Sequence, residues 1–591
     1  MSITTMYFKQ KNFLAICLII LSLFSCKIKI KTVRDVMDRK ISFLYRTMDP
    51  KELMALDYEK VFSLFSVEEK EILATKHWAF DVNVPVVVSV MRSIEQKIVP
   101  FWLTENGFIR TDLTMKNEQT TYEVWQKSFN TGTVGLGING FENYPLHYFV
   151  SVAPQSGKDS LVLNNFLPAN QFVGTLDNGA FTYHDWDELV LYDVPGTMKG
   201  QKLLTTVRGR GVESQLTGVF RTTDFPSGTL PDQIMLTWSS DPEIGIDIQW
   251  RTDTTITEGV VKYRETGSTG EFAAVAGKYV MDDRVLLNDC SVNRYTARLR
   301  ELKPGTTYEY RVVPQDKYRE NQTFSTPAGD GDFTFIWFGD THHSPEFGKL
   351  IRTAEKRHPE TAFYSIAGDI VSDGLFRNQW DEIFEYTGEV ICRKSLMVVP
   401  GNHDNRAGLG ALMFRELFSY PVNGPEGVEK EQTYSFRYKN ALFLMIDATS
   451  PIDAQTKWIE DQLAASDATW NFAMFHFPPY SSEGGYPEIR RKWCTLFDRY
   501  HVDMVMSGHV HNYLRTKPMK DDKPVASPSQ GTVYLVSIGI PDNDTQPVLP
   551  FAELQLSGEM LYQKVSINGN KLEYKVMNID GLIRDQLTII K

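Results

Sequence analysis

Polar side chains that can bind metal follow several apolar runs in the second half of this chain. The run at 333–338 leads into Gly339-Asp340-Thr341-His342, and the run at 362–367 leads into Gly368-Asp369. Three later runs end in the same way. The polar residues at these ends are Asp340, His342, Asp369, Asn402, His403, Asp404, His476, His509 and His511. They include five of the 11 histidines in the chain, so chance is a poor explanation. Converging carboxylates and imidazoles predict a metal site.

The apolar runs have the length of buried strands, and the stretches between them have the pattern of helices. The helical stretches are 347–359, 378–394, 456–466 and 487–500. Strands that alternate with helices at such intervals are typical of βαβ units in parallel sheets. Ligands of such sheets bind outside the carboxyl ends of the strands. The sequence therefore predicts an α/β layered domain with a metal site at one edge.

The cysteines exclude two kinds of site. Apart from Cys17 and Cys26 near the N-terminus, the chain has Cys290, Cys392 and Cys494, which are far apart in sequence. This spacing suits neither a zinc–thiolate centre nor a disulfide framework, and we expect three buried thiols. Carboxylates and imidazoles without thiolates suit Mn, Fe(II) or Zn better than copper or an iron–sulfur cluster.

Taken in order, the motifs D-x-H, GD, GNHD, an isolated His and GHxH resemble those of the calcineurin-like metallophosphoesterases. The resemblance covers about residues 329–591, and GHVHNYLRTKPM (508–519) is most similar to the purple acid phosphatase branch. It implies a four-layer α-β-β-α fold, in which helices cover a pair of sheets and two metal ions lie between them. The implied activity is the hydrolysis of phosphate esters.

The resemblance also implies roles for single residues. Asp340, His342 and His511 would bind one metal ion, Asn402, His476 and His509 would bind the other, and Asp369 would bridge both. His403 would donate a proton to the leaving oxygen. A carboxylate would orient the His403 ring, and both Asp373 and Asp404 are candidates.

The chain departs from purple acid phosphatases at two positions. Where they carry a tyrosine whose phenolate gives them their colour, this chain has Ser372, and it has His342, which they lack. We therefore expect metal binding in the generic metallophosphoesterase manner and a colourless protein. His343 and Tyr480 are further candidates for substrate contact, with packing as the equal alternative. Arg377 is a candidate for binding phosphate.

At 591 residues the chain is too long for a single core, and its pattern changes along its length. After the N-terminal segment 1–26, we expect a helical segment (27–80), a β-rich accessory region (81–228), a β-sandwich (229–328) and the metallophosphoesterase-like domain (329–591). Ser66 and Glu69 have capping-box spacing in the helical segment. The sandwich resembles fibronectin type III domains and the sandwich that precedes the catalytic domain of purple acid phosphatases. Tyr308 would be its tyrosine corner.

Residues 1–26 have the pattern of a signal peptide. Two lysines precede the apolar run Phe13–Phe24, which is too short to span a membrane stably. The segment that ends in Ser25-Cys26 resembles a bacterial lipobox, although Phe24 is larger than the residue usual there. We expect export and a lipid anchor on Cys26, with ordinary secretion as the alternative.

The net charge of −12 argues against a nucleic-acid-binding surface, which needs a basic face. The prediction is an exported enzyme that acts on small phosphate esters. Phosphomonoesters are the leading substrates, and phosphodiesters or nucleotide pyrophosphates are the alternative, because substrate choice depends on loops around the site. A nuclease would need a basic groove. A surface binding protein with a vestigial site is a further alternative, which the intact ligand positions disfavour.

Overall fold

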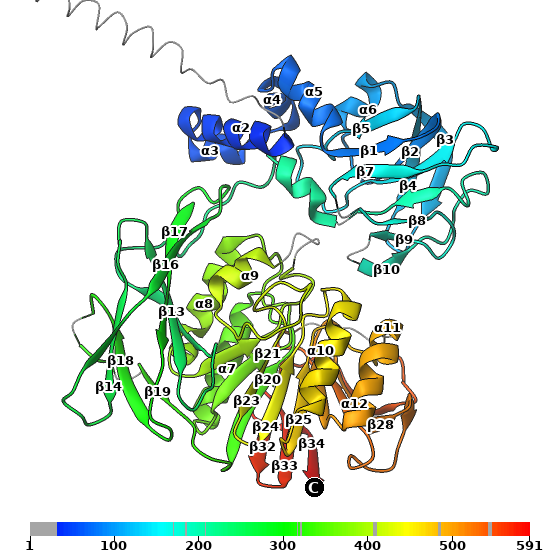
Figure 1. Cartoon of the computed structure of the whole chain (residues 1–591). Coiled ribbons are helices and arrows are strands. Elements are labelled where there is room, and N and C mark those ends of the chain that lie inside the picture. The colour runs from blue at the N-terminus through cyan, green and yellow to red at the C-terminus, as the bar shows by residue number, and fades with distance from the viewer. Residues whose placement is uncertain are drawn as a thin grey trace, which may run out of the picture. The chain divides into compact units, whose positions relative to one another are not determined.

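The computed structural model of the chain describes residues 32–591, except 170, 184–185, 207, 316, 320–321, 406–410, 483–485 and 542–545. The predicted signal peptide and Cys26 lie outside these residues. The chain forms two compact units (Figure 1). The first contains the residues up to Thr206 together with Gly211–Gly218, and the second contains Val207–Arg210 and Val219–Lys591. In the part of the chain described, no helix has the length and apolar character needed to cross a membrane.

The first unit begins with helices whose starts are set by local sequence. They are α2 (Val33–Thr47), α3 (Pro50–Met54), α4 (Tyr58–Ser63) and α5 (Val67–Thr75). At the start of α5, the side chains of Ser66 and Glu69 each accept a hydrogen bond from the backbone N–H of the other residue. The capping box predicted at this position is confirmed.

The rest of the first unit consists mainly of antiparallel sheets. A six-stranded sheet has the order β3-β4-β2-β6-β11-β8, and a three-stranded sheet has the order β5-β1-β7. The strands are β1 (Trp78–Val82), β2 (Val86–Ser93), β3 (Ile109–Lys116), β4 (Thr121–Phe129), β5 (Gly132–Leu136), β6 (Phe149–Pro154), β7 (Leu163–Leu167), β8 (Val173–Thr175) and β11 (Lys202–Leu204), and β9 (Phe181–Tyr183) pairs with β10 (Trp186–Val190). The short helix α6 (Phe101–Glu105) also belongs to this unit, and η1 (Arg208–Ser214) belongs to it from Gly211 on.

The second unit starts with a β-sandwich of two four-stranded sheets, β12-β13-β17-β16 and β15-β14-β18-β19. Its strands are β12 (Asp232–Thr237), β13 (Ile246–Asp253), β14 (Val260–Glu265), β15 (Phe272–Val275), β16 (Gly277–Asp282), β17 (Ser291–Leu299), β18 (Thr307–Val312) and β19 (Thr323–Ser325). Tyr308 on β18 is buried, and its hydroxyl oxygen accepts a hydrogen bond of 2.9 Å from the backbone N–H of Lys303. The predicted tyrosine corner is confirmed.

Two larger sheets follow, with the orders β22-β21-β20-β32-β33-β34 and β23-β24-β25-β26-β30-β27-β31. Their strands are β20 (Phe333–Phe338), β21 (Phe363–Ile366), β22 (Ser395–Val398), β23 (Tyr434–Tyr438), β24 (Ala441–Met445), β25 (Trp470–Met474), β26 (Met504–Ser507), β27 (Tyr513–Thr516), β30 (Val533–Val536), β31 (Ala552–Leu556), β32 (Leu561–Asn568), β33 (Lys571–Asn578) and β34 (Ile583–Ile590). In the first sheet β20, β21 and β22 are parallel, and in the second β24, β25, β26 and β30 are parallel. The parallel strands from β20 to β22 and from β24 to β26 are joined by helices, as the βαβ pattern predicted, whereas short strands lie between β26 and β30.

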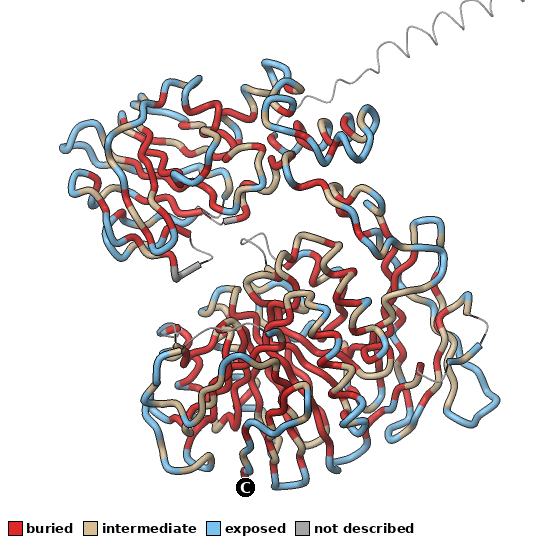
Figure 2. Tube along the Cα trace, turned by 180° about the vertical axis from the view of Figure 1, so that it is seen from behind, coloured by how far each residue is buried: buried red, intermediate tan, exposed pale blue. Residues whose placement is uncertain are grey.

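The two larger sheets face each other across an aromatic core. The ring of Phe335 on β20 lies 5.1 Å from that of Phe443 on β24 and 5.5 Å from that of Phe472 on β25, between centroids. Helices α7 (Pro345–Arg357) and α8 (Arg377–Ile391) cover one sheet, and α10 (Ile452–Ala464) and α12 (Thr495–Tyr500) cover the other (Figure 1). Buried residues follow the strands between these helices (Figure 2). The predicted four-layer α-β-β-α domain is confirmed.

One expectation about the cysteines is wrong. Cys392 and Cys494 are buried as predicted, but Cys290 is exposed. Cys290 stands in the loop between β16 and β17, directly before the first residue of β17. A surface loop leaves its thiol open to solvent.

Candidate metal centre

The predicted ligands stand just past the ends of parallel strands. Asp340 follows the end of β20, Asp369 follows β21, Asn402 follows β22, His476 follows β25, and His509 and His511 follow β26. These strands belong to the two facing sheets. The side chains of the residues that follow them come together in two groups. The residues are therefore brought together by the topology that the sequence pattern predicted.

The first group comprises Asp340, His342 and His511, whose ligand atoms all lie within 4.8 Å of one another. The Nε2 atoms of the two histidines are 3.3 Å apart, and Nε2 of His511 is 3.3 Å from Oδ2 of Asp340. Oδ1 of Asp340 accepts a hydrogen bond from the backbone N–H of His509. Oδ2 is buried and makes no well-formed hydrogen bond within the described residues. A bound cation would give this oxygen a partner.

The second group comprises Asp369, His476 and His509, again with all ligand atoms within 4.8 Å. Oδ1 of Asn402 joins them, 3.0 Å from Nε2 of His476 and 3.1 Å from Nδ1 of His509. His476 is fully buried, and its Nδ1 lies 2.9 Å from the carbonyl oxygen of Ala367. Because a carbonyl oxygen only accepts, Nδ1 carries a hydrogen, and Nε2 is the nitrogen that faces the group.

Asp369 lies between the two groups. Its Oδ2 atom is 3.2 Å from Nε2 of His476 in the second group and 4.0 Å from Nε2 of His342 in the first. Its Oδ1 atom accepts a hydrogen bond of 2.8 Å from the backbone N–H of His403. This bond fixes the orientation of the carboxylate, with Oδ2 facing a histidine of each group.

The backbone at the strand ends is unusual. His342, Asp369 and His509 have φ angles of 43°, 50° and 73°, in the left-handed region that costs energy for residues other than glycine. Two glycines permit close packing of the carboxylates. A Cβ on Gly401 would lie 2.1 Å from Oδ1 of Asp369, and one on Gly508 would lie 2.2 Å from Oδ1 of Asp340. Such strain clusters at functional sites.

The buried charges of the centre depend on one another. Burial opposes ionisation of Asp369, but His476, His403 and His342 hold its pKa well below the usual value. Burial also disfavours the charged form of His476, yet Asp369 and Asp340 raise its pKa to about 9. Burial lowers the pKa of His342. Converging carboxylate, amide and imidazole donors without thiolate suit two ions of the Mn, Fe or Zn type. The His and Asp groups therefore fit a two-metal centre.

His403 stands beside this centre. Its Nε2 atom is 3.9 Å from Oδ2 of Asp369, and its side chain is 37% exposed. Its Nδ1 atom lies 2.8 Å from the carbonyl oxygen of Ser372. Because that oxygen only accepts, Nδ1 carries a hydrogen and Nε2 is the atom that can exchange a proton with a ligand. The ring is oriented by the main chain.

This geometry corrects the expectation that the carboxylate of Asp373 or Asp404 orients His403. The buried carboxylate of Asp404 accepts hydrogen bonds from the N–H groups of Ile370, Val371 and Gly401. Burial and the charge of Asp369 raise its pKa to about 7. Asp404 therefore shapes the turn that carries Asp369. The carboxylate of Asp373 accepts a hydrogen bond from the backbone N–H of Leu375 in its own loop.

Comparison with known proteins finds two domain families that match parts of this chain. The sequence profile of the calcineurin-like phosphoesterases matches residues 333–513, and that of the purple acid phosphatase N-terminal domain matches residues 231–326. The chain thus carries a calcineurin-like phosphoesterase domain after a purple acid phosphatase N-terminal domain. The predicted resemblance is confirmed.

Similar proteins differ widely in sequence from this chain. An uncharacterised protein of Mycobacterium tuberculosis is 24% identical over 319 residues, which cover 46% of this chain and 60% of that protein. Purple acid phosphatase 1 of Ipomoea batatas is 23% identical over 319 residues, which cover 49% of this chain and 66% of that protein. The chain thus spans less than two thirds of the length of either relative. The structure of purple acid phosphatase PPD1 from yellow lupin (Lupinus luteus) seeds matches with a TM-score of 0.55 at 16% sequence identity. The match covers 88% of this chain and 93% of the lupin chain, which shows a shared fold.

Two further candidates in the phosphoesterase domain have partners of their own. Nδ1 of His343 lies 2.7 Å from a carboxylate oxygen of Glu382. Tyr480 is buried, and its hydroxyl donates a hydrogen bond of 2.8 Å to Asp522. The Tyr480 ring also packs against Tyr534 and Phe551, at 4.8 and 5.6 Å between centroids.

The expectation that Arg377 binds phosphate is wrong. Its side chain is 1% exposed and forms ion pairs with Asp289, at 3.1 Å, and with Asp381, at 3.5 Å. Asp289 belongs to the sandwich. Arg377 therefore joins the phosphoesterase domain to the sandwich.

One residue beside the centre was not predicted. The hydroxyl oxygen of Tyr486 lies 2.9 Å from Nε2 of His509, and its ring stacks on Phe477 at 4.6 Å between centroids. A hydroxyl oxygen that accepts from Nε2–H leaves the lone pair on Nδ1, the nitrogen that faces Asn402. Tyr486 stands directly before α11 (Pro487–Ile489), and no motif marks it.

Proposed function

We propose that this protein is a metal-dependent hydrolase of phosphate esters, with phosphomonoesters as its leading substrates. The position of Asp369 carries the proposal, because its Oδ2 atom is 3.2 Å from a ligand nitrogen of one group and 4.0 Å from a ligand nitrogen of the other. One carboxylate shared by two ligand groups suits a pair of ions a few ångströms apart, a site type that phosphatases use for in-line displacement. The family matches of both domains support the same activity.

In this proposal each ligand group holds one ion. Asp340, His342 and His511 hold the first, Asn402, His476 and His509 hold the second, and Asp369 is shared. Mn, Fe and Zn are the metals that this donor set favours. When bound, such a pair supplies hydroxide near neutral pH and neutralises charge on the phosphoryl oxygens.

His403 is the proposed proton donor. The hydrogen on its Nδ1 atom is committed to the carbonyl oxygen of Ser372, at 2.8 Å, so proton exchange takes place at Nε2. The side chain is 37% exposed, which leaves the ring open to a bound ester. A proton donor matters most when the leaving group is a poor one, such as an alkoxide.

We also propose that the mature protein is exported and anchored by a lipid on Cys26. The short apolar run and the lipobox-like residues before Cys26 support this. Mass spectrometry of the N-terminal peptide, compared with a Cys26→Ser variant, tests it. We expect an acylated Cys26 as the first residue. An unmodified peptide that runs through Cys26 would contradict the anchor.

The activity is tested with purified protein supplied with Mn²⁺ or Zn²⁺. Turnover of p-nitrophenyl phosphate is compared with turnover of bis(p-nitrophenyl) phosphate, which shares its leaving group. We expect faster turnover of the monoester. Faster turnover of the diester would replace the phosphomonoesterase by a phosphodiesterase, and no turnover of either ester with metal bound would contradict the proposal.

A further inference from the structure

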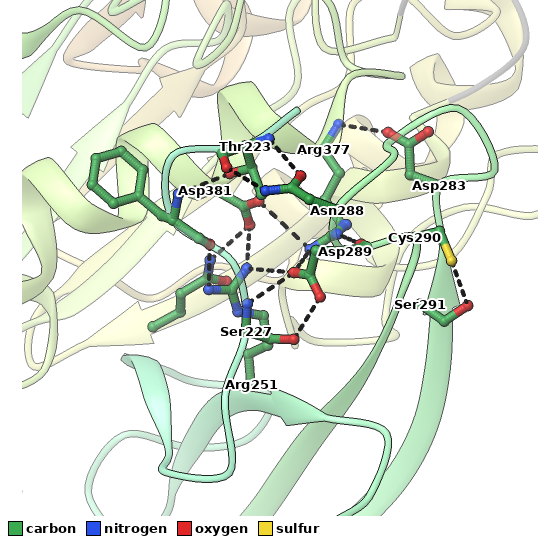
Figure 3. Close-up of polar contacts among 12 residues, drawn as sticks. Thr223, Ser227, Arg251, Asp283, Asn288, Asp289, Cys290, Ser291, Arg377 and Asp381 are labelled. Atoms are coloured by element: carbon green, nitrogen blue, oxygen red, sulfur yellow. Dashed lines mark hydrogen bonds and ion pairs between the residues drawn. The ribbon is translucent and has the colours of Figure 1, made fainter. Parts of the chain in front are cut away.

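Helix α8 begins without a cap of its own. Phe376 precedes its first turn and offers no side-chain acceptor for the unpaired N–H groups there. The sandwich supplies one instead. Oδ2 of Asp283, in the loop after β16, accepts a hydrogen bond of 3.2 Å from the backbone N–H of Arg377 (Figure 3). A buried negative charge at this end also suits the dipole of the helix.

Arg221 holds the same end of α8 from the segment that leads into the sandwich. Its guanidinium pairs with Asp283 and donates to the side-chain oxygen of Asn378, at 2.6 Å, and to the carbonyl oxygen of Leu375, at 3.3 Å. It also lies 4.0 Å from the centre of the Phe376 ring. Arg221 thus contacts both the start of the helix and the loop before it.

Other buried charges fix the first turn of α8 to the sandwich (Figure 3). Arg377 donates to Asp289 at 3.1 Å, and Asp381 accepts a hydrogen bond of 2.7 Å from Arg251 on β13. Arg377, Asp381 and Arg251 are each almost fully buried. Separating such pairs would leave charges unpaired in the interior, which is costly. The first turn of α8 is therefore held against the sandwich by buried charges.

The loop in front of α8 is the loop that holds His403. The carbonyl oxygen of Ser372 accepts the hydrogen of the His403 ring, and the N–H of Gly374 donates to the carbonyl oxygen of His403 at 2.9 Å. The indole N–H of Trp380 on α8 donates to the carbonyl oxygen of Gly374 at 3.1 Å. The first turn of α8, the loop and the His403 ring are thus connected by consecutive hydrogen bonds.

We propose that Arg221 and Asp283 are positioning residues for His403. They hold the start of α8 and the loop 372–376 before it, and the carbonyl oxygen of Ser372 in that loop keeps the His403 ring in its orientation. This inference rests on the proposed function, in which His403 protonates the leaving group. It gives the sandwich and its leading segment a part in the reaction beyond packing.

Three variants of the full-length protein test the inference. Arg221→Met removes the charge and the hydrogen bonds but keeps an apolar stem, and Asp283→Asn keeps an oxygen for the N–H of Arg377 but removes the charge. Tyr310→Phe is the matched control, because the hydroxyl of Tyr310 in the sandwich donates to the carbonyl oxygen of Cys392 at the opposite end of α8. For each variant we would measure kcat for p-nitrophenyl phosphate and for an alkyl phosphate, amide hydrogen exchange and thermal unfolding.

We expect Arg221→Met to lower kcat for the alkyl phosphate about tenfold more than kcat for p-nitrophenyl phosphate, because only the alkoxide needs a proton donor. Amide exchange in 372–378 should become faster. Asp283→Asn should act in the same direction with a smaller effect. Tyr310→Phe should leave the ratio of the two kcat values and the exchange of 372–378 unchanged, even where the melting temperature falls.

Equal losses on both esters in Arg221→Met, or the same change of ratio in Tyr310→Phe, would overturn the inference. If Arg221→Met does not fold, Asp283→Asn provides the comparison with Tyr310→Phe. If the unaltered protein hydrolyses neither ester, the proposed function fails. The exchange of 372–378 then still decides whether Arg221 and Asp283 hold the loop.

Discussion

The two ligand groups of the metal centre differ in how firmly the protein holds their histidines. In the second group, the side chain of His476 is 0% exposed, and its outer nitrogen lies 2.9 Å from the carbonyl oxygen of Ala367. The outer nitrogen of His509 lies 2.9 Å from the hydroxyl of Tyr486. Both rings of this group are thus oriented by a short hydrogen bond on the side away from the ligand cluster.

The first group is looser. The side chains of His342 and His511 are 13% and 23% exposed. The outer nitrogen of His342 lies 3.4 Å from the hydroxyl oxygen of Ser372, near the upper limit for a hydrogen bond. A ring that is already oriented loses less freedom when it binds a metal, so the second group should bind its ion more tightly than the first.

Asp369→Asn should have the largest effect, because it removes the charge that both groups share. We expect turnover to fall about a thousandfold or more, since the loss of several kcal/mol of charge stabilisation corresponds to such a factor. Bound metal, measured by elemental analysis after dialysis, should fall below two ions per chain. Asp467→Asn is the control, because the side chain of Asp467 is 83% exposed. Unchanged metal content in Asp369→Asn would contradict the shared position of this carboxylate.

His403→Ala should separate proton transfer from metal binding, because His403 belongs to neither group. We expect a loss of about 10²- to 10⁴-fold in kcat for alkyl phosphates and a much smaller loss for nitrophenyl phosphates, whose leaving group needs no proton. Both ions should remain bound, as calorimetric titration with Zn²⁺ would show. Equal slowing of both esters would argue against a proton donor at this position.

The residues of the two groups could be predicted from the sequence because each follows the end of a strand. An apolar run followed by Asp340 or Asp369 is a local pattern, and parallel strands bring their carboxyl ends to one edge. The layers of the phosphoesterase domain follow from the same alternation of strands and helices. The left-handed backbone at Asp369 and His342 is not visible in such a pattern, although it aims both side chains.

What the sequence could not show depends on packing between distant segments. The partner of the His403 ring is the main-chain oxygen of Ser372, which any residue type would supply. Arg377 looked available for phosphate, but its partner Asp289 stands 88 residues earlier in the chain. Tyr486 stands 23 residues before His509, without a motif that connects the two. These contacts follow only from the folded arrangement of the domains and loops.

Tyr486→Phe tests how firmly the second group holds its histidines. The variant keeps the ring that stacks on Phe477 but removes the hydroxyl next to His509. Loss of a partner behind a metal-binding histidine lowers metal affinity by about 10- to 100-fold. We expect a loss of this size for the ion bound more tightly, measured by calorimetric titration of metal-depleted protein with Zn²⁺. Tyr438→Phe, which changes a buried tyrosine in the aromatic core between the sheets, is the control and should leave both affinities unchanged.

Ser372→Ala tests how firmly the first group holds His342, and it should have the smallest effect. The hydroxyl of Ser372 is 3.4 Å from Nδ1 of His342, so its loss should lower the affinity for the more weakly bound ion by less than about threefold. The main-chain oxygen of residue 372 remains, so His403 keeps its orientation and the ratio of alkyl to nitrophenyl turnover should not change. A loss of affinity as large as that in Tyr486→Phe would show that the outer contacts hold both groups equally. In that case the two ions should also leave together when a chelator is added, rather than one before the other.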